Sequence, residues 1–228
     1  MEWIGGQDSI LNNDSPYTSC KEIFQAVCDE IGTYYTTKGF KYAKSRPSIT
    51  YKDKEITLQI AFWSSGYNTP GDYVNVEIIP AFFSTKIARV KKTAQPRSKR
   101  GYLFGHPAIF LHDLPGREPG TVRIRQIFGD EMERYEEGKS EKLNHSCNVY
   151  GITHEKFENI IHFIDNHIIS YIDVLKDHEK LLAFIEGSNK ERSYYLNNPE
   201  LLEYIEIAFP SRKGQLIEVL QKKIESGL

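Results

Sequence analysis

The chain has 228 residues, of which 39% are hydrophobic and 12% aromatic. This is enough apolar material for a substantial core, so an intrinsically disordered chain is excluded. The charges of its 29 basic and 31 acidic residues nearly cancel, which excludes a general electrostatic attraction to nucleic acid or to membranes. Its three cysteines are too few for a disulfide framework.

The N-terminal sequence shows no basic start followed by an apolar run and a small-residue cleavage site. Elsewhere no apolar run reaches the roughly 18 residues that cross a bilayer. We therefore expect a soluble, cytoplasmic protein. Residues 1–17 are rich in Gly, Asn, Asp and Ser without sustained periodicity, and they predict an arm with little structure of its own.

The first predicted helix covers residues 20–38. Ser19 and Glu22 have the S-x-x-E spacing of a capping box, in which each side chain satisfies a free backbone donor. Apolar residues from Phe24 onward recur at spacings of three and four, and Gly39 supplies a left-handed stop. Cys28 falls on this apolar stripe, which predicts a buried free thiol.

After this helix the hydrophobic period changes from 3.6 to 2, which is typical of strands. A proline cannot donate a ladder hydrogen bond, so a strand that contains one is expected at an edge or a bulge. We expect strands at residues 42–51 (interrupted near Pro47), 56–63, 73–83, 108–111 and 121–128. The strands at 56–63 and 73–83 should pair antiparallel.

The last third of the sequence predicts helices. Thr153 caps a long helix with a broad apolar stripe, which breaks near Asp177 and stops at Gly187. Residues 198–200 open the next helix with an Asn cap, a proline and a carboxylate near the positive end of the helix dipole. A final helix starts at Ser211.

This order of elements predicts an α+β fold, in which an N-terminal helix and C-terminal helices pack on one face of an antiparallel sheet. The expected organisation is an arm at residues 1–17, an α+β core domain at 18–187 and a helical extension at 188–228 that packs on the core.

Two segments carry runs of like charge, and each has two interpretations. In one interpretation the basic run is a binding site for phosphates, nucleic acid or an acidic protein, and in the other it is a solvated loop between strands. For the acidic run, one interpretation is a surface that imitates an anionic ligand and covers a partner's basic groove, and the other is a solvated surface. The basic run holds Lys86, Arg89, Lys91, Lys92, Arg97, Lys99 and Arg100, and the acidic run holds Asp130, Glu131, Glu133, Glu136, Glu137 and Glu141.

No catalytic or metal-binding motif such as H-E-x-x-H, C-x-x-C, G-x-S-x-G or a Walker loop is present. His145 and Cys147 lack a second pair of ligands, so they do not predict a metal site. We expect no cofactor and favour a non-enzymatic function. A metal-dependent hydrolase or nuclease-like enzyme stays open, with Asp72, Glu77 and Asp113 as its carboxylates, because acids that meet in space need not be close in sequence.

The strand period places five residues on the sheet face opposite the apolar one: Gln59, Trp63, Tyr73, Asn75 and Glu77. Arg123 and Arg125 lie beside them if residues 121–128 join the same sheet. Either helices leave this face open, or they cover it and Trp63 is a core residue. Trp, Tyr and Arg anchor protein interfaces because they combine apolar area with a polar tip. The predicted partner-binding residues are Trp63, Tyr67, Tyr73, Glu77, Lys91, Lys92, Arg125, Glu133, Glu136 and Glu137.

Three segments carry a resemblance to a known group of proteins: FQAVCDEIGTYYTTKGFKY, ITLQIAFWSSGYNTPGDYVNVEIIPAFF and NIIHFIDNHIISYIDVLKDHEKLLAFIEG. Over residues 20–187 the chain resembles uncharacterised small bacterial α+β proteins similar to the immunity proteins that neutralise polymorphic toxins. The resemblance implies a protein that binds a cognate toxin and occludes it sterically. The alternatives are the hydrolase described above and a nucleic-acid-binding module that uses the basic residues 86–100.

Overall fold

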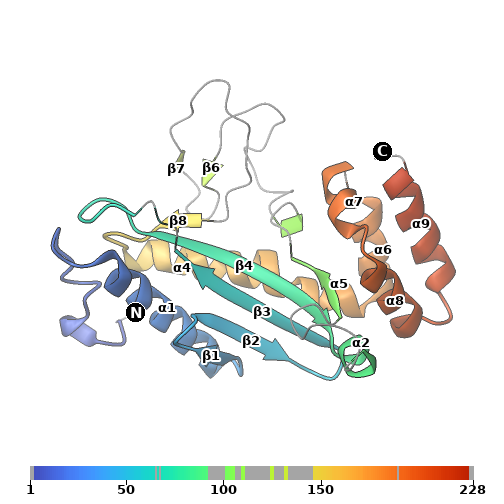
Figure 1. Cartoon of the computed structure of the whole chain (residues 1–228), viewed down its shortest axis with the longest axis horizontal. Helices are drawn as coiled ribbons and strands as arrows, with labels where there is room; N and C mark the ends of the chain where they lie inside the picture. The colour runs from blue at the N-terminus through green and yellow to red at the C-terminus, as the bar shows by residue number, and fades with distance from the viewer. Residues whose placement is uncertain are drawn as a thin grey trace. The chain divides into compact units, whose positions relative to one another are not determined.

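The computed structural model describes residues 3–64, 66, 68–91, 101–105, 109–110, 124–125, 131–132, 146–188 and 190–225. The chain forms two compact units. Unit 1 comprises residues 1–51, 59–79 and 113–165, and unit 2 comprises residues 52–58, 80–112 and 166–228. The predicted α+β class is confirmed (Figure 1). No helix in the described part of the chain is long and apolar enough to span a lipid bilayer.

The main sheet has six antiparallel strands within the described residues. Their order is β1-β2-β3-β4-β5, with β8 paired to β4. Strands β5 and β8 were not predicted, because three residues are too few to show a period of two. The strands are β1 (Lys41–Ala43), β2 (Ser48–Lys52), β3 (Ile56–Trp63), β4 (Asn75–Ser84), β5 (Tyr102–Phe104) and β8 (Ser146–Asn148).

Two predicted strands are wrong. The expected strand at residues 42–51 is a hairpin in which Lys41 pairs with Thr50, and Pro47 lies in its turn, where no ladder donor is needed. Ile109 and Phe110, in the expected strand at 108–111, are helical. The prediction failed because a short apolar run does not distinguish a helix from a strand. Of the predicted strand at residues 121–128 the structure describes β6 (Ile124–Arg125), which pairs with β7 (Glu131–Met132) in a separate two-stranded sheet.

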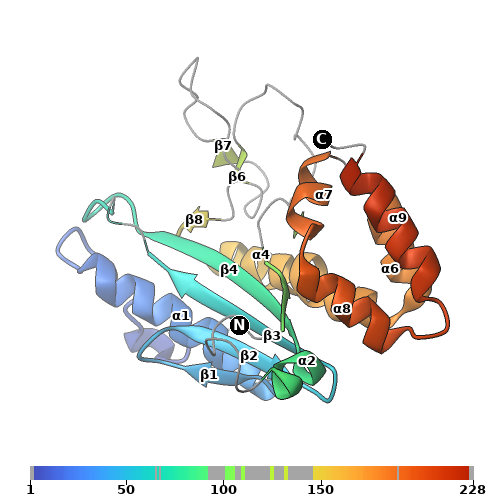
Figure 2. The same cartoon turned by 45° about the vertical axis from the view of Figure 1, so that its right-hand side comes forward.

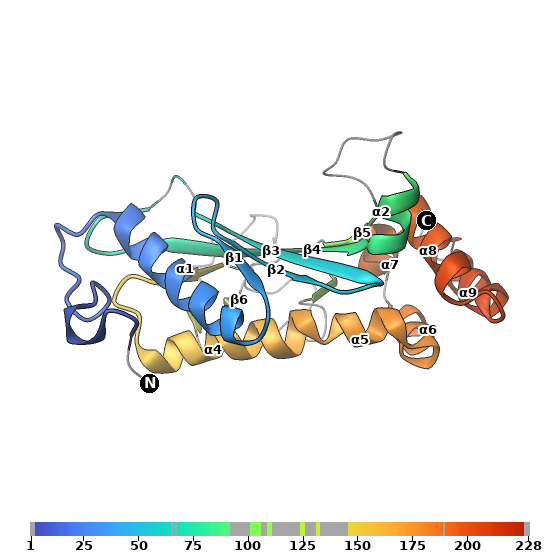
Figure 3. The same ribbon diagram turned by 90° about the horizontal axis from the view of Figure 1, so that it is seen from below.

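Unit 1 is built on helices α1 (Cys20–Thr37) and α4 (His154–Ile164). The capping box of α1 is present, with the Glu22 amide donating to Ser19 Oγ at 3.2 Å, and Gly39 has the predicted left-handed φ of 85°. Thr153 caps α4, as predicted. Figure 3 shows α4 running along one face of β3 and β4, so the apolar stripe of α4 is buried against that face.

The N-terminal arm packs against the rest of unit 1, a contact that was not predicted. It contains a short 3-10 helix, η1 (Gly6–Asp8). Trp3 is only 5% exposed and stacks on His154, with 4.0 Å between ring centroids. The Ile4 amide donates to Glu30 Oε1 at 2.6 Å. A buried apolar residue without a periodic neighbour gives no sequence signal, so this contact could not be predicted.

Tyr35 joins α1 to α4 within unit 1. Its buried hydroxyl donates to Asp165 Oδ1 at 2.8 Å, and Lys38 Nζ lies 2.8 Å from Asp165 Oδ2. Burial, together with the Asp165 carboxylate, raises the pKa of the Tyr35 hydroxyl, which therefore stays protonated as a donor.

We expect Tyr35→Phe to lower the free energy of unfolding by about 1–2 kcal/mol, because it removes a hydrogen bond to a charged, partly buried acceptor. Urea denaturation would measure the change. Tyr17→Phe is the matched control, since Tyr17 is 97% exposed and should give no change. Equal stabilities of the two variants would contradict the role of the Tyr35 hydroxyl.

Unit 2 is mainly helical, and Figure 2 shows α6, α8 and α9 packed side by side. Its core holds an aromatic cluster of Phe82, Phe104, Phe110, Tyr171 and Phe184. The helices of unit 2 are α2 (Thr85–Val90), α5 (Tyr171–Lys176), α6 (His178–Glu186), α7 (Lys190–Leu196), α8 (Pro199–Ala208) and α9 (Lys213–Glu225), and a π-helical segment, η4 (Asp165–Ile169), precedes α5.

The predicted helix break near Asp177 and the predicted cap at Asn198 are confirmed. Asp177 lies at the predicted break and accepts from the Lys180 amide, and Asn198 accepts from the Glu200 amide, each at 3.0 Å. The Asn198 side chain also donates to the carbonyls of Tyr102 and Leu103, at 2.8 and 2.9 Å. One side chain therefore both begins α8 and ties it to β5.

Asp53 holds the turn before β3 in unit 2. Its Oδ1 accepts from the Glu55 and Ile56 amides at 2.8 Å each, and Oδ2 pairs with Lys176. Burial of this side chain raises the pKa, but the hydrogen bonds and the lysine outweigh burial and hold the pKa of Asp53 at about 2.

This lowered pKa predicts a pH-dependent effect of Asp53→Asn. The folded state favours the carboxylate, so its stabilisation is complete above the ordinary pKa of 3.8 and is lost as the pH falls through about 2. At neutral pH we expect the free energy of unfolding of the variant to be about 1–2 kcal/mol lower than that of the wild type. This figure is smaller than the pKa shift alone would give, because the side chain is 24% exposed and solvent screens its interactions. Urea denaturation between pH 7 and pH 2 should show the two proteins converging in acid, and a constant difference would contradict the assignment.

Candidate partner-binding site

Strands β3 and β4 present one polar, accessible face within unit 1. Burial alternates along β3, where Ile60 and Phe62 are buried while Gln59 and Trp63 are exposed. Trp63 is 55% exposed, so it is not a core residue. On β4 the exposed position is Ile79, at 39%. The face opposite α4 therefore carries two large apolar side chains in contact with solvent.

A pocket of about 910 Å³ is sunk into this face, and all its lining residues belong to unit 1. Three parts of the unit form its walls: the first turn of α1, the turn between β1 and β2, and the end of β3 with the loop that follows. The lining is mainly apolar, and its apolar residues include Phe24, Pro47, Ala61, Trp63, Pro70 and Ile79.

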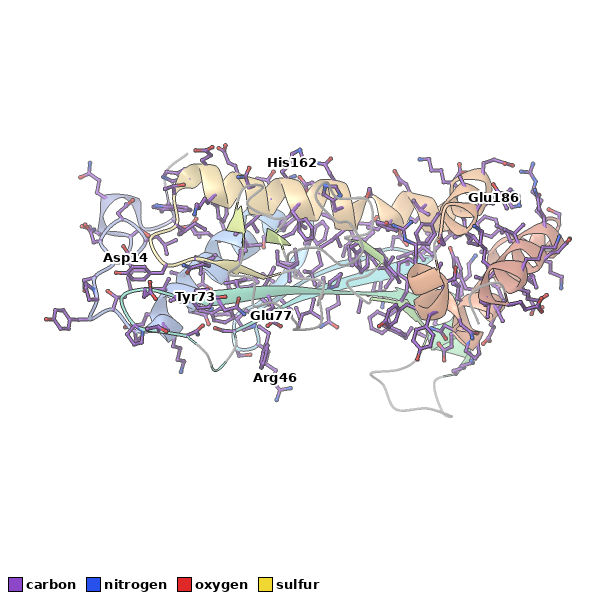
Figure 4. The ribbon with its side chains drawn as sticks, turned by 90° about the horizontal axis from the view of Figure 1, so that it is seen from above. Asp14, Arg46, Tyr73, Glu77, His162 and Glu186 are labelled. Atoms are coloured by element: carbon purple, nitrogen blue, oxygen red, sulfur yellow. The ribbon has the colours of Figure 1, made fainter. Side chains whose placement is uncertain are left out.

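Two cations stand at this pocket. Lys21 comes from the first turn of α1 and Arg46 from the hairpin turn, and both side chains are exposed. Figure 4 shows Arg46 and Glu77 on the side of β4 opposite α4. None of the described residues that line the pocket is acidic. The pocket therefore combines an apolar floor with a positively charged rim.

Hydrogen bonds join the described residues of the loop between β3 and β4. The Asn68 side chain donates to Ser64 Oγ at 2.7 Å and accepts from the Asn75 amide at 2.8 Å. Beyond it, Thr69 and Tyr73 exchange backbone hydrogen bonds of 2.8 Å. Ser64 and Asn68 thus hold the wall of the pocket in place, which explains two of the polar residues that follow Trp63 in the sequence.

A second polar chain lies along β4. The Tyr73 hydroxyl donates to Asn75 Oδ1 at 3.2 Å, and Asn75 Nδ2 donates to Glu77 Oε1 at 3.3 Å. Burial raises the pKa of the Glu77 carboxyl, while the hydrogen bond from Asn75 partly offsets that rise. Tyr73 and Glu77 belong to unit 1, as Trp63 does, but neither of them lines the pocket.

The described part of the basic run belongs to unit 2, whereas Trp63 belongs to unit 1. Residues 85–90 form α2 rather than a loop, with Ser84 as its N-cap. Lys86 Nζ lies 3.2 Å from Glu55, and Lys91 Nζ lies 2.6 Å from Glu203 and 3.5 Å from Glu200. Acids distant in sequence thus neutralise these two cations, which the local charge pattern could not reveal.

Of the other predicted residues, those that the structure describes do not line the pocket. Arg125 lies in β6, which belongs to a separate two-stranded sheet, so the condition for its place on the face of the main sheet is not met. Asp72 is exposed in the turn before β4, and Cys147 is buried, with its thiol 3.7 Å from the Val76 carbonyl. In the described residues no three His, Cys, Asp or Glu side chains form a cluster fit for a metal. Predictions for Tyr67, Lys92, Arg97, Lys99, Arg100, Asp113, Asp130, Glu133, Glu136, Glu137, Glu141 and His145 fall outside the described residues.

Several residues of the pocket were not among those predicted from the sequence. Ile79 could have been found by continuing the period of two from Glu77. Phe24 was assigned to the buried stripe of α1, but Ile23 takes that place and Phe24 lines the pocket. No sequence pattern predicts that Lys21 and Arg46 line the same pocket, because this depends on how α1 and the hairpin pack together. No protein-family model, no curated protein and no solved structure matches this chain.

Proposed function

We propose that the chain is a protein-binding module whose partner docks on the Trp63 face of unit 1. The observation that carries this proposal is a half-exposed tryptophan beside an apolar pocket of about 910 Å³. A pocket of this size holds a few side chains of a partner, and a tryptophan at its edge is a typical interface anchor.

The proposed mechanism is steric. A partner that inserts side chains between Trp63 and Ile79 buries apolar area. Asn68 is already held by hydrogen bonds to Ser64 and Asn75, so little conformational entropy is lost at this side chain on binding. The resemblance to immunity proteins supports a toxin as the partner, neutralised because the bound module blocks its functional surface. No catalytic step by this chain is needed for such inhibition.

The pocket can be blocked by one substitution. Ala61 lies on the half-exposed face of β3 and lines the pocket, so Ala61→Phe should fill it while the fold is retained. The partner would be captured from the source cell, identified by mass spectrometry, purified and titrated against both proteins by isothermal calorimetry. We expect binding to the wild type and none measurable to Ala61→Phe.

Ala43→Phe is the matched control. Ala43 is exposed on β1 and does not line the pocket, so the same exchange should leave affinity unchanged. Circular dichroism would verify that all three proteins are folded. A partner that binds Ala61→Phe as tightly as Ala43→Phe would show that the pocket is not its docking site.

A further inference from the structure

The charges at the pocket specify the chemistry of the segment that enters it. Lys21 and Arg46 both line the pocket, and neither makes an ion pair with any residue the structure describes. Lys44, two residues before Arg46, differs: its Nζ lies 2.7 Å from Asp29 Oδ2. The hairpin turn therefore contains one neutralised cation and one that lines the pocket with no ion pair to any described residue.

Building on the proposed function, we infer that the pocket binds a partner segment in which an aromatic or branched apolar residue is flanked by Asp or Glu. The apolar residue packs against Phe24, Trp63 and Ile79. The flanking carboxylates pair with Lys21 and Arg46, which approach from two different elements. A basic segment meets two like charges, and no carboxylate of the pocket lining offsets them.

Gln59 favours a peptide over a free amphipathic acid. Its side chain is exposed in the pocket and makes no hydrogen bond with the described residues. A carboxamide offers both a donor and an acceptor, which matches the alternating groups of an extended peptide backbone. Ser64 and Asn68, in contrast, already bond to each other.

The test uses a phage-displayed library of random peptides, panned on the full chain. We expect enriched peptides to carry Phe, Trp, Leu or Ile next to Asp or Glu. The tightest peptide is then synthesised with its natural acids and with Asn or Gln in their place. Both peptides are titrated by calorimetry against the wild type, Lys21→Ala/Arg46→Ala and a control of equal net charge, Lys52→Ala/Lys54→Ala, whose lysines are exposed outside the pocket.

The acidic peptide should bind Lys21→Ala/Arg46→Ala about 3–30-fold more weakly than it binds the wild type or the control, because two partly exposed ion pairs are lost. On that variant the acidic and the neutral peptide should bind alike, which is the signature of direct coupling. Enriched peptides that need Trp63 but are not acidic, or that bind the double variant as well as the control, would overturn the acidic preference and leave the docking site intact. If no enriched peptide depends on Trp63, both this inference and the proposed function fail, and titration of lauric acid would then test for a small amphipathic acid.

Discussion

Replacing Gly32 by alanine is expected to lower the free energy of unfolding by about 2–4 kcal/mol, although alanine is the better helix former by about 1 kcal/mol. Gly32 is buried in α1, and the ring of Tyr42 lies against it. A Cβ at Gly32 would stand 2.4 Å from Tyr42 Cγ and 2.5 Å from both Cδ atoms. The ring must move, and its hydroxyl is held at 2.7 Å from Asp29 Oδ1, so the shift also strains that bond.

A double-mutant cycle separates this clash from any other effect of the substitution. In a Tyr42→Ala background the added methyl group has room, and Gly32→Ala should be neutral or stabilising by up to about 1 kcal/mol. Urea denaturation of the four proteins gives the coupling free energy. Equal losses in the two backgrounds would show that the ring does not set the cost.

Trp63→Ala is expected to weaken binding of the partner by about 30-fold or more, since a tryptophan anchor at an interface contributes about 2 kcal/mol or more. Stability should change by less than about 0.5 kcal/mol, because the side chain is 55% exposed in the free protein. Calorimetric titration and urea denaturation measure the two quantities separately.

The matched control for this substitution is Tyr17→Ala. Tyr17 is 97% exposed on unit 1 and lies outside the pocket, so its loss removes comparable aromatic area without touching the site. The Trp63 assignment is wrong if the two variants bind the partner equally well.

Elements with strong local signals were predictable from the sequence. The capping box at Ser19, the stop at Gly39 and the Asn198 cap depend on side chains that bond to their own backbone, so a few neighbouring residues suffice to recognise them. The alternation along β3 likewise identified the exposed side of Trp63. Pro47 marked a break in the strand pattern, but not that the chain reverses there into a hairpin.

The pocket was only partly predictable, because its walls come from separate elements. Trp63 was identified from the strand pattern. Lys21 and Arg46 each look like ordinary surface cations, and only the packing of α1 beside the hairpin brings them to one rim. Lys91 shows the reverse case, since acids of α8 neutralise a residue that looked uncompensated in sequence.

The distribution of the cysteines provides a chemical handle on the site. Cys28 and Cys147 are buried, and burial raises the pKa of the Cys28 thiol well above its usual value, which makes it a poor nucleophile toward alkylating reagents. Cys20 is partly accessible and lines the pocket. A maleimide fluorophore should therefore label the native wild-type chain at Cys20, and the rate of that labelling serves as a direct footprint of pocket occupancy without any engineered residue.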